Sequence, residues 1–299
     1  MTVAASIDIG TNSTRLLIVR KEGAQLNALH MEERITSLGE GLGKKGYLKP
    51  EALDRVTEVL SEYMGYIREY EAESIFIVAT SAAREASNRE LLLERVKSTT
   101  GYNCRIISGE DEARLTFLGV MSDLNTFSKM LICDIGGGST ELTLVDHGKQ
   151  LNQISLSVGS RRLKESFLHH NPVQDEEMTV LNSHTEAILS QYLWFYGDSS
   201  IQCIMVGGTA TTLAMIDSGV ELFEEKKVHG YVLSHSSIVQ IVKKLSSMSI
   251  EEREHVAGLH PKRADIIVAG AMITEVILRL FGFPSCQISV RDLLFGLLV

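Results

Sequence analysis

The chain is expected to fold as a duplicated α/β protein, with two lobes that face each other across a central cleft. One observation is a repeat. Asp8-Ile9-Gly10 recurs as Asp134-Ile135-Gly136, and Ser13-Thr14 recurs as Ser139-Thr140, at one offset of 126 residues (134 − 8). Each copy lies between two apolar runs, which predicts a strand, a tight polar turn and a second strand. Strand and helix patterns then alternate, which favours mixed sheets with helices on their faces.

Length and composition agree with this division. At 299 residues one hydrophobic core usually gives way to two. We expect one domain over 1–124, a second over 125–286, and a last segment of about 287–299 that packs back on the first. The 4 cysteines lie far apart without metal-ligand spacing, as in a reducing compartment. With no signal peptide pattern and no apolar run of ~20 residues, the protein is expected to be cytoplasmic and not bound to membranes.

The net charge of −9 argues against a general nucleic-acid surface, which needs a basic patch. A polyanionic ligand stays possible where a metal ion and local basic residues supply the positive field. Arg15, Arg84 and Arg263 are candidates for that field, although an average surface Arg is simply solvated.

In the first half, the pattern predicts a helix from Pro50 to Tyr70 and a strand from Ser74 to Ala79. Asn88 is expected to cap a helix through Val96. Another strand follows over Cys104–Ile107, and then a helix opens at Ser108.

In the second half, the crossing loop is expected over 122–128, before a strand that begins at Met130. Asp146-His147-Gly148 reads as a hairpin turn. The remaining expected elements are helices over 159–167, 175–195 and 264–281, a strand over 201–206, and a closing strand and short helix over 286–299.

The repeated turns suggest a ligand. Glycine and small hydroxyl residues let several backbone N–H groups approach one anion. An Asp at the end of the incoming strand cannot contact that anion and instead suits a cation. Two such hairpins across a cleft would hold a phosphate chain with its Mg²⁺, or with Mn²⁺. A third turn, Gly207-Gly208-Thr209, follows a buried strand and is either a further anion site or a plain tight turn.

Three consecutive carboxylates, Glu110, Asp111 and Glu112, open the helix that begins near Ser108. Acidic residues in a first turn complement the helix dipole, so the simplest interpretation is capping. Three exceed what capping requires, and at least one is therefore a functional candidate.

These motifs together resemble one family, the exopolyphosphatases and guanosine pentaphosphate phosphohydrolases. The matching segments appear in family order over nearly the whole chain: residues 8–13, 79–84, 108–115, 134–142, 207–214 and 228–230. The resemblance implies two ribonuclease-H-like domains of the actin and sugar-kinase superfamily. The chain is similar to short members, which lack a further helical domain.

The resemblance also implies roles by position. Glu112 matches the carboxylate that activates the attacking water. Asp134 and Glu141 match acidic residues that hold the divalent metal, and Glu141 can also help to orient the water. Arg15 and Arg263 match basic positions implicated in binding the nucleotide alarmone. The phosphate-cradling positions are Thr11, Asn12, Ser13, Gly136, Gly137, Gly138, Ser139, Gly208 and Thr209, and with Asp8 as a third metal ligand these complete the expected site.

One segment departs from the family pattern. Members commonly close with Asp-x-Gly-Leu-Arg-Glu-Gly, whereas this chain has Val290-Arg291-Asp292-Leu293-Leu294-Phe295-Gly296. The change bears on substrate choice more than on catalysis, because Asp8, Glu112, Asp134 and Glu141 are all present.

The expected activity is therefore release of terminal orthophosphate from inorganic polyphosphate, from guanosine pentaphosphate, or from both, by metal-assisted attack of water. Two alternatives remain at this point. One is a phosphotransferase of the same superfamily, since the same phosphate turns serve kinases. The other is a protein that binds guanosine tetra- or pentaphosphate for regulation with little turnover. A homodimer is expected from the resemblance alone.

Overall fold

The computed structural model describes residues 1–123, 129–195 and 201–299. Two compact units divide the chain: the first unit is Met1–Leu124 with Arg291–Val299, and the second unit is Asn125–Val290. Most of the expected crossing loop, 124–128, lies outside the described residues. The α/β class expected from the alternating pattern is confirmed by a mixed sheet in each unit.

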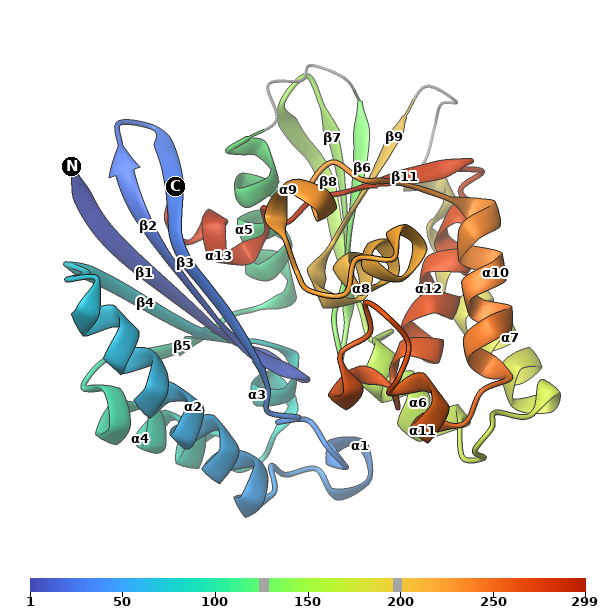
Figure 1. Ribbon diagram of the computed structural model, residues 1–299, viewed down its shortest axis with the longest axis horizontal. Helices are drawn as coiled ribbons and strands as arrows, with labels where there is room; N and C mark the ends of the chain where they lie inside the picture. The colour runs from blue at the N-terminus through green and yellow to red at the C-terminus, as the bar shows by residue number, and fades with distance from the viewer. Residues whose placement is uncertain (124–128, 196–200) are drawn as a thin grey trace. The chain divides into compact units, whose positions relative to one another are not determined.

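The first unit contains a five-stranded sheet in the order β3-β2-β1-β4-β5 (Figure 1). Strands β1 to β3 are antiparallel neighbours, while β4 and β5 run parallel to β1. The strands are β1 (Thr2–Ile9), β2 (Ser13–Glu22), β3 (Gln25–Ile35), β4 (Ser74–Ala79) and β5 (Cys104–Ile106).

Helices cover both faces of this sheet. Alternate residues of β1 therefore belong to different cores: Ile7 and Ile9 pack with α2 and α4, whereas Ala4 packs with Leu294 and Phe295 of α13. Figure 1 shows α2 and α4 together on one face. A strand that is buried on both faces reads as a continuous apolar run, as β1 does. The helices are α1 (Leu42–Lys45), α2 (Pro50–Glu69), α3 (Ser81–Glu85), α4 (Arg89–Thr100), α5 (Gly109–Met121) and α13 (Leu293–Gly296).

The expected side-chain cap on α4 is wrong. Asn88 does stand before the helix, but its side chain makes no cap hydrogen bond. Instead its Oδ1 accepts from the N–H of Leu48 at 2.8 Å and its Nδ2 donates to the carbonyl of Leu48 at 3.0 Å. An amide side chain can satisfy both polar groups of one peptide, and here that long-range use replaces the local one.

The second unit repeats the same plan. Its six-stranded sheet has the order β10-β11-β9-β6-β7-β8, with β6, β7 and β8 antiparallel and β9 and β11 parallel to β6. The strands are β6 (Met130–Ile135), β7 (Thr140–Asp146), β8 (Lys149–Leu156), β9 (Gln202–Val206), β10 (Val232–Ser234) and β11 (Ser285–Ile288). The helices are α6 (Ser160–Phe167), α7 (Asp175–Leu189), α8 (Gly207–Ser218), α9 (Glu225–Val228), α10 (His235–Ser246), α11 (Ile250–Arg253) and α12 (Ile267–Leu280), with 3₁₀ turns at Ser190–Phe195 and Pro261–Arg263.

The duplication extends to fine detail. The β2–β3 pair shifts register between Ile18 and Val19, and the β7–β8 pair shifts between Leu144 and Val145, again 126 residues later. The expected hairpin turn is present, because His147 and Gly148 both have positive φ, at 51° and 71°. Two copies of one supersecondary unit therefore account for both halves.

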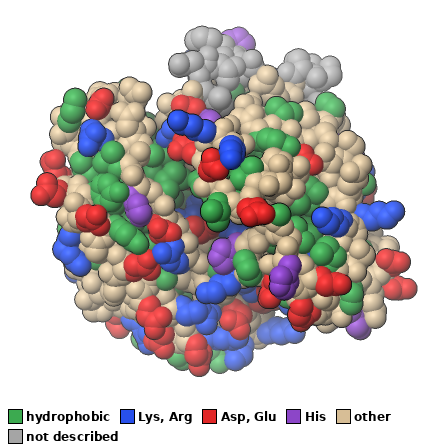
Figure 2. All heavy atoms as spheres, in the orientation of Figure 1, with side chains coloured by type: hydrophobic (Ala, Val, Ile, Leu, Met, Phe, Trp, Pro, Cys, Tyr) green, Lys and Arg blue, Asp and Glu red, His purple; other side chains and the backbone are tan. Residues whose placement is uncertain are grey.

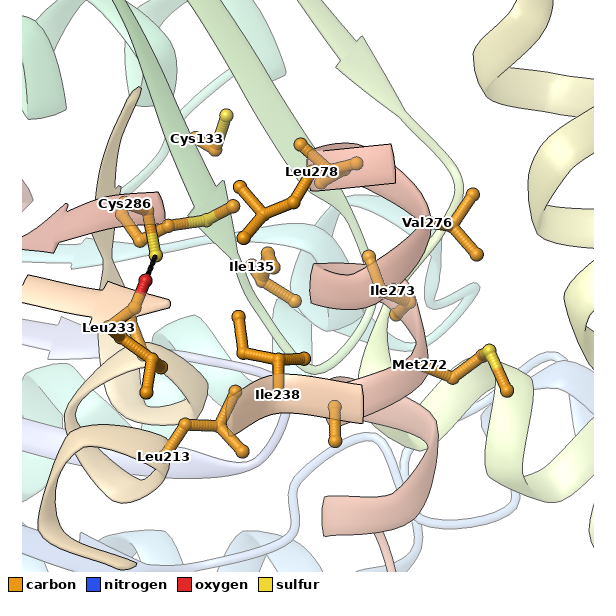
Figure 3. Close-up of a cluster of buried hydrophobic side chains, with 14 of the residues drawn as sticks. Cys133, Ile135, Leu213, Leu233, Ile238, Met272, Ile273, Val276, Leu278 and Cys286 are labelled. Carbon is orange, nitrogen blue, oxygen red and sulfur yellow. Dashed lines mark hydrogen bonds between the residues drawn. The ribbon is translucent and has the colours of Figure 1, made fainter. Parts of the chain in front are cut away.

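The core of the second unit lies between its sheet and its long helices. Figure 3 shows Ile135 from the sheet among Leu213, Ile238 and Ile273 from α8, α10 and α12. Cys286 is also there, with its Sγ 3.8 Å from the carbonyl oxygen of Leu233. Burial raises the pKa of the Cys286 thiol to about 12, so this thiol is a core group and not a nucleophile.

Acidic and basic side chains lie next to one another over much of the face shown in Figure 2. Among the described residues no helix combines the length and the apolar character that a membrane crossing requires.

Candidate active site

The first turn, Gly10–Ser13, is fixed by hydrogen bonds of its own backbone to neighbouring segments. The N–H of Gly10 donates to the carbonyl of Ser13 at 2.9 Å and closes the turn. The carbonyl of Asn12 accepts from Ser37 at 2.8 Å, and that of Thr11 accepts from Gly39 at 2.9 Å. Thr11 Oγ1 also accepts from a backbone N–H of α3 at 3.2 Å. These bonds fix the turn rigidly at the end of β1.

The second turn, Gly136–Ser139, closes in the same way, with Gly136 donating to Ser139 at 3.0 Å. Its carbonyls point to the start of α6: Gly136 and Gly137 accept from the N–H groups of Ser160 and Arg161, and Gly138 accepts from Nε of Arg162 at 2.7 Å. Within the described ranges, neither Gly137 nor Gly138 donates its own N–H to a backbone carbonyl. Such N–H groups suit an anion.

The third turn, Gly207–Thr209, lies beside the second. A Cβ on Gly207 would stand 2.7 Å from Oδ1 of Asp134, and Gly207 has a φ of +87°. A Cβ on Gly208 would stand 2.1 Å from a guanidinium nitrogen of Arg263. The glycines therefore let backbone, carboxylate and guanidinium approach closely. The structure places Asp134 beside Gly207 and Arg263 beside Gly208, at two successive positions of the third turn.

Asp134 and Glu141 are cross-strand partners on β6 and β7, which places the two carboxylates side by side. Glu141 is 2% exposed, and its Oε1 accepts from the hydroxyl of Ser155 on β8 at 2.7 Å. Sequence reasoning missed Ser155. The hairpin turn at 146–148 was the available signal, because its register sets Glu141 opposite Ser155.

The equivalent pair in the first unit is different. Asp8 and Arg15 are cross-strand partners on β1 and β2, so an arginine occupies the position that Glu141 has in the second unit. Arg15 donates from Nη2 to Oδ2 of Asp8 at 2.7 Å and from Nε to the same oxygen at 3.1 Å. The two hairpins have the same backbone arrangement but different charges: Asp8 is paired with an arginine, whereas Asp134 is paired with a glutamate.

Burial raises the pKa of the Asp8 carboxyl, and the neighbouring Arg15 counteracts that increase. Oδ1 of Asp8 is buried and has no hydrogen-bond partner among the described residues. An open carboxylate oxygen in a buried place favours a cation or an ordered water. Asp8 thus fits the metal-ligand role that the sequence predicts.

Among the three carboxylates of α5, the structure distinguishes Glu112. Its side chain is 12% exposed, and its Oε2 accepts from Arg84 at 2.6 Å. Asp111 is 39% exposed and pairs with Arg105 and Arg114. Ser108 caps the helix by accepting from the N–H of Asp111. Capping and surface pairing therefore account for Asp111, whereas Glu112 is held in place by Arg84.

The predicted metal ligands come from different units, with Asp8 in the first and Asp134 and Glu141 in the second. In the part of the chain that the structure describes, no group of three or more Asp, Glu, His or Cys side chains is arranged so that it could hold a metal ion. Mg²⁺ is commonly bound by one or two carboxylates, with waters and substrate phosphates completing its shell. The Asp134–Glu141 pair fits that requirement.

Gly207→Ala is expected to destabilise the second unit by about 1–2 kcal/mol, because its backbone is left-handed, and to displace the Asp134 carboxylate. Gly219→Ala is the matched control, since Gly219 has a φ of +70° but nothing within 4 Å of a Cβ. Thermal unfolding and phosphate-release assays check both variants. Only Gly207→Ala should slow phosphate release. Equal rates of phosphate release for the two variants would show that a Cβ at position 207 does not disturb the Asp134 carboxylate.

Comparison with known proteins supports one family. The Ppx/GppA phosphatase family model matches residues 17–299. A bifunctional 3-dehydroquinate synthase/phosphatase of Fusobacterium nucleatum is 35% identical over 98% of this chain, which spans only 45% of that protein. Exopolyphosphatase 2 of Mycobacterium tuberculosis is 30% identical, with 99% of this chain and 98% of that protein covered.

Among solved structures, an exopolyphosphatase from Cytophaga hutchinsonii superimposes with a TM-score of 0.92 at 28% identity, over 99% of this chain and 96% of that one. The family-model match includes the second and third turns, and the two structures superimpose over nearly the whole chain. The chain belongs to the Ppx/GppA phosphatase family.

Proposed function

We propose that this protein is a phosphohydrolase that releases terminal orthophosphate from inorganic polyphosphate, from guanosine pentaphosphate, or from both. The observation that carries the proposal is the repeated turn, present once in each unit with a buried carboxylate on the strand that enters it. Family membership and the exopolyphosphatase relatives support the same activity.

The chemistry requires little covalent participation by the protein. A terminal phosphoryl group leaves through a loose transition state, so catalysis consists mainly of positioning water and neutralising oxygens. The N–H groups of Gly137 and Gly138 and the hydroxyls of Ser13 and Ser139 would bind phosphate oxygens. Arg263 would add positive charge beside the third turn. These groups fix the phosphate chain before reaction.

Glu112 would accept the proton of the attacking water. Arg84 occupies one of its oxygens, Oε2, and orients the carboxylate. In the second unit, Asp134 and Glu141 would hold Mg²⁺ or Mn²⁺, which when bound neutralises negative charge on phosphate oxygens. Asp8 is the candidate metal ligand of the first unit. Glu141 would also orient the water.

The proposal extends to a cytoplasmic homodimer that does not act on nucleic acid. The net charge of −9 and the interspersed charges in Figure 2 support the last point, since nucleic-acid binding needs a basic surface.

The test is a phosphate-release assay on the purified protein with Mg²⁺ and no acceptor. Short polyphosphate, long polyphosphate and guanosine pentaphosphate are compared in parallel. Free orthophosphate from at least one substrate is expected. Transfer that occurs only with an added hydroxyl acceptor would identify a phosphotransferase instead. Tight binding of guanosine tetraphosphate without release from any substrate would identify a regulatory binding protein.

A further inference from the structure

Asp292, near the C-terminal end of the chain, contacts the ion pair that Asp8 and Arg15 form beside the first turn. Its Oδ2 accepts from Nη1 of Arg15, the nitrogen that Asp8 does not use. Its Oδ1 accepts from the N–H of Leu294 at 3.0 Å and so caps α13. The Asp292 side chain is 8% exposed and that of Arg15 is 19% exposed. Both carboxylate oxygens of Asp292 are thus engaged.

The guanidinium of Arg15 forms hydrogen bonds along two of its edges. Nε and Nη2 bind one oxygen of Asp8, and Nη1 binds Asp292. A planar guanidinium held in this way cannot rotate, because rotation would break charge-assisted bonds on both sides. Because Arg15 binds Oδ2, the other oxygen of Asp8, Oδ1, stays buried and has no hydrogen-bond partner among the described residues.

We propose that Asp292 is a positioning residue. It holds Arg15 in the orientation that occupies Oδ2 of Asp8 and leaves Oδ1 without a hydrogen-bond partner among the described residues, available to a cation. This inference rests on the proposed function for its consequence, but not for the geometry itself. It assigns a task to the segment 290–296, in which this chain departs from the family pattern.

The segment is well anchored for that task. Leu294 and Phe295 are buried against Leu17 and Val19 of β2. The hydroxyl of Ser6 on β1 donates to the carbonyl of Leu294 at 2.8 Å. Arg291 stacks over the ring of Phe295 at 4.1 Å. Asp292 therefore stands on a rigid support beside the same two strands that carry Asp8 and Arg15.

Asp292→Asn is the informative variant, because Asn keeps an oxygen that can cap α13 while its amide nitrogen cannot accept from Arg15. Leu298→Ala is the matched control. Leu298 is 1% exposed in the same core, and its aliphatic side chain has no group that could form an ion pair or hydrogen bond with Arg15. Both variants are expected to lower the melting temperature, so all functional measurements are made well below it.

Two readouts separate positioning from stability. The first is the Arg15 Nε–H signal in NMR, which should exchange slowly with water in the wild-type protein and in Leu298→Ala, and rapidly in Asp292→Asn. The second is the Mg²⁺ concentration for half-maximal phosphate release, which should rise about 10-fold in Asp292→Asn, as typical for loss of a residue that orients a metal ligand. Leu298→Ala should leave it within about 2-fold, below that range.

An Arg15→Gln background completes the test, since Asp292 acts only through Arg15. Adding Asp292→Asn there should change the Mg²⁺ requirement no further. The proposal is overturned if Asp292→Asn keeps the slow Nε–H exchange, or if it matches Leu298→Ala in both readouts. If the wild-type protein releases no phosphate, the proposed function fails, while the exchange measurement still decides whether Asp292 holds Arg15.

Discussion

Glu112→Gln is expected to lower the rate of phosphate release by at least ~100-fold while the fold and phosphate binding stay intact. General base assistance is typically worth ~10²–10⁴-fold, and the glutamine amide cannot accept the proton. The substitution conserves shape, and the amide oxygen can still accept from Arg84 as Oε2 of Glu112 does. The loss should therefore appear in kcat and not in KM.

The control for this prediction is Asp111→Asn in the same helical turn. Asp111 contacts Arg105 and Arg114 at the surface. The kcat of Asp111→Asn should therefore stay within about 2-fold of the wild-type value, a much smaller change than the loss of a general base causes. Steady-state release assays and circular dichroism on all three proteins make the comparison. A Glu112→Gln variant that turns over nearly as fast as the wild type would move the base role to another carboxylate, with Glu141 the first to examine.

Gly296→Ala is expected to destabilise the first unit by about 3 kcal/mol, because its Cβ would overlap the backbone of another helix. That Cβ would lie 1.8 Å from the carbonyl oxygen of Leu115 in α5. Reciprocally, a Cβ on Gly119 would lie 1.9 Å from the carbonyl oxygen of Asp292. Backbone atoms cannot move aside as a flexible side chain can, so α13 must separate from α5.

Thermal unfolding tests this directly, with an expected fall in melting temperature of about 6–12 °C for a domain of this size. Gly65→Ala in the middle of α2 is the control, since its Cβ would meet nothing within 4 Å. Alanine should stabilise that helix by about 0.5–1 kcal/mol. A Gly296→Ala protein as stable as the wild type would mean that α13 does not approach α5 as closely as described.

The sequence predicted those parts of the fold that depend on local pattern. The repeat of Asp8-Ile9-Gly10 at Asp134 predicted both hairpins, apolar periodicity predicted α2, and a long apolar run predicted α12. Strand β3 was not predicted. Most of its side chains are only partly buried, and its polar residues obscure the alternation of apolar and polar positions that marks a strand. The cap expected from Asn88 failed for a related reason, since Leu48, forty residues earlier, competes for the same amide.

The candidate site shows the same limit. Turn residues such as Gly137 and Gly208 carry their chemistry in their own identity, so a motif can name them. The pairing of Arg15 with Asp292 could not be predicted, because 277 residues separate the two and only the folded chain brings them together. Likewise, nothing local to Glu112 indicates that Arg84 would hold it. The roles of these residues remain predictions that the variants above test.

Single turnover in ¹⁸O-labelled water tests the central claim most directly, namely that water attacks the terminal phosphorus atom. If Glu112 aims solvent at that atom, each orthophosphate released from polyphosphate carries one ¹⁸O atom, and the shortened chain carries none. Label in the shortened chain instead, or unlabelled orthophosphate, would contradict the account.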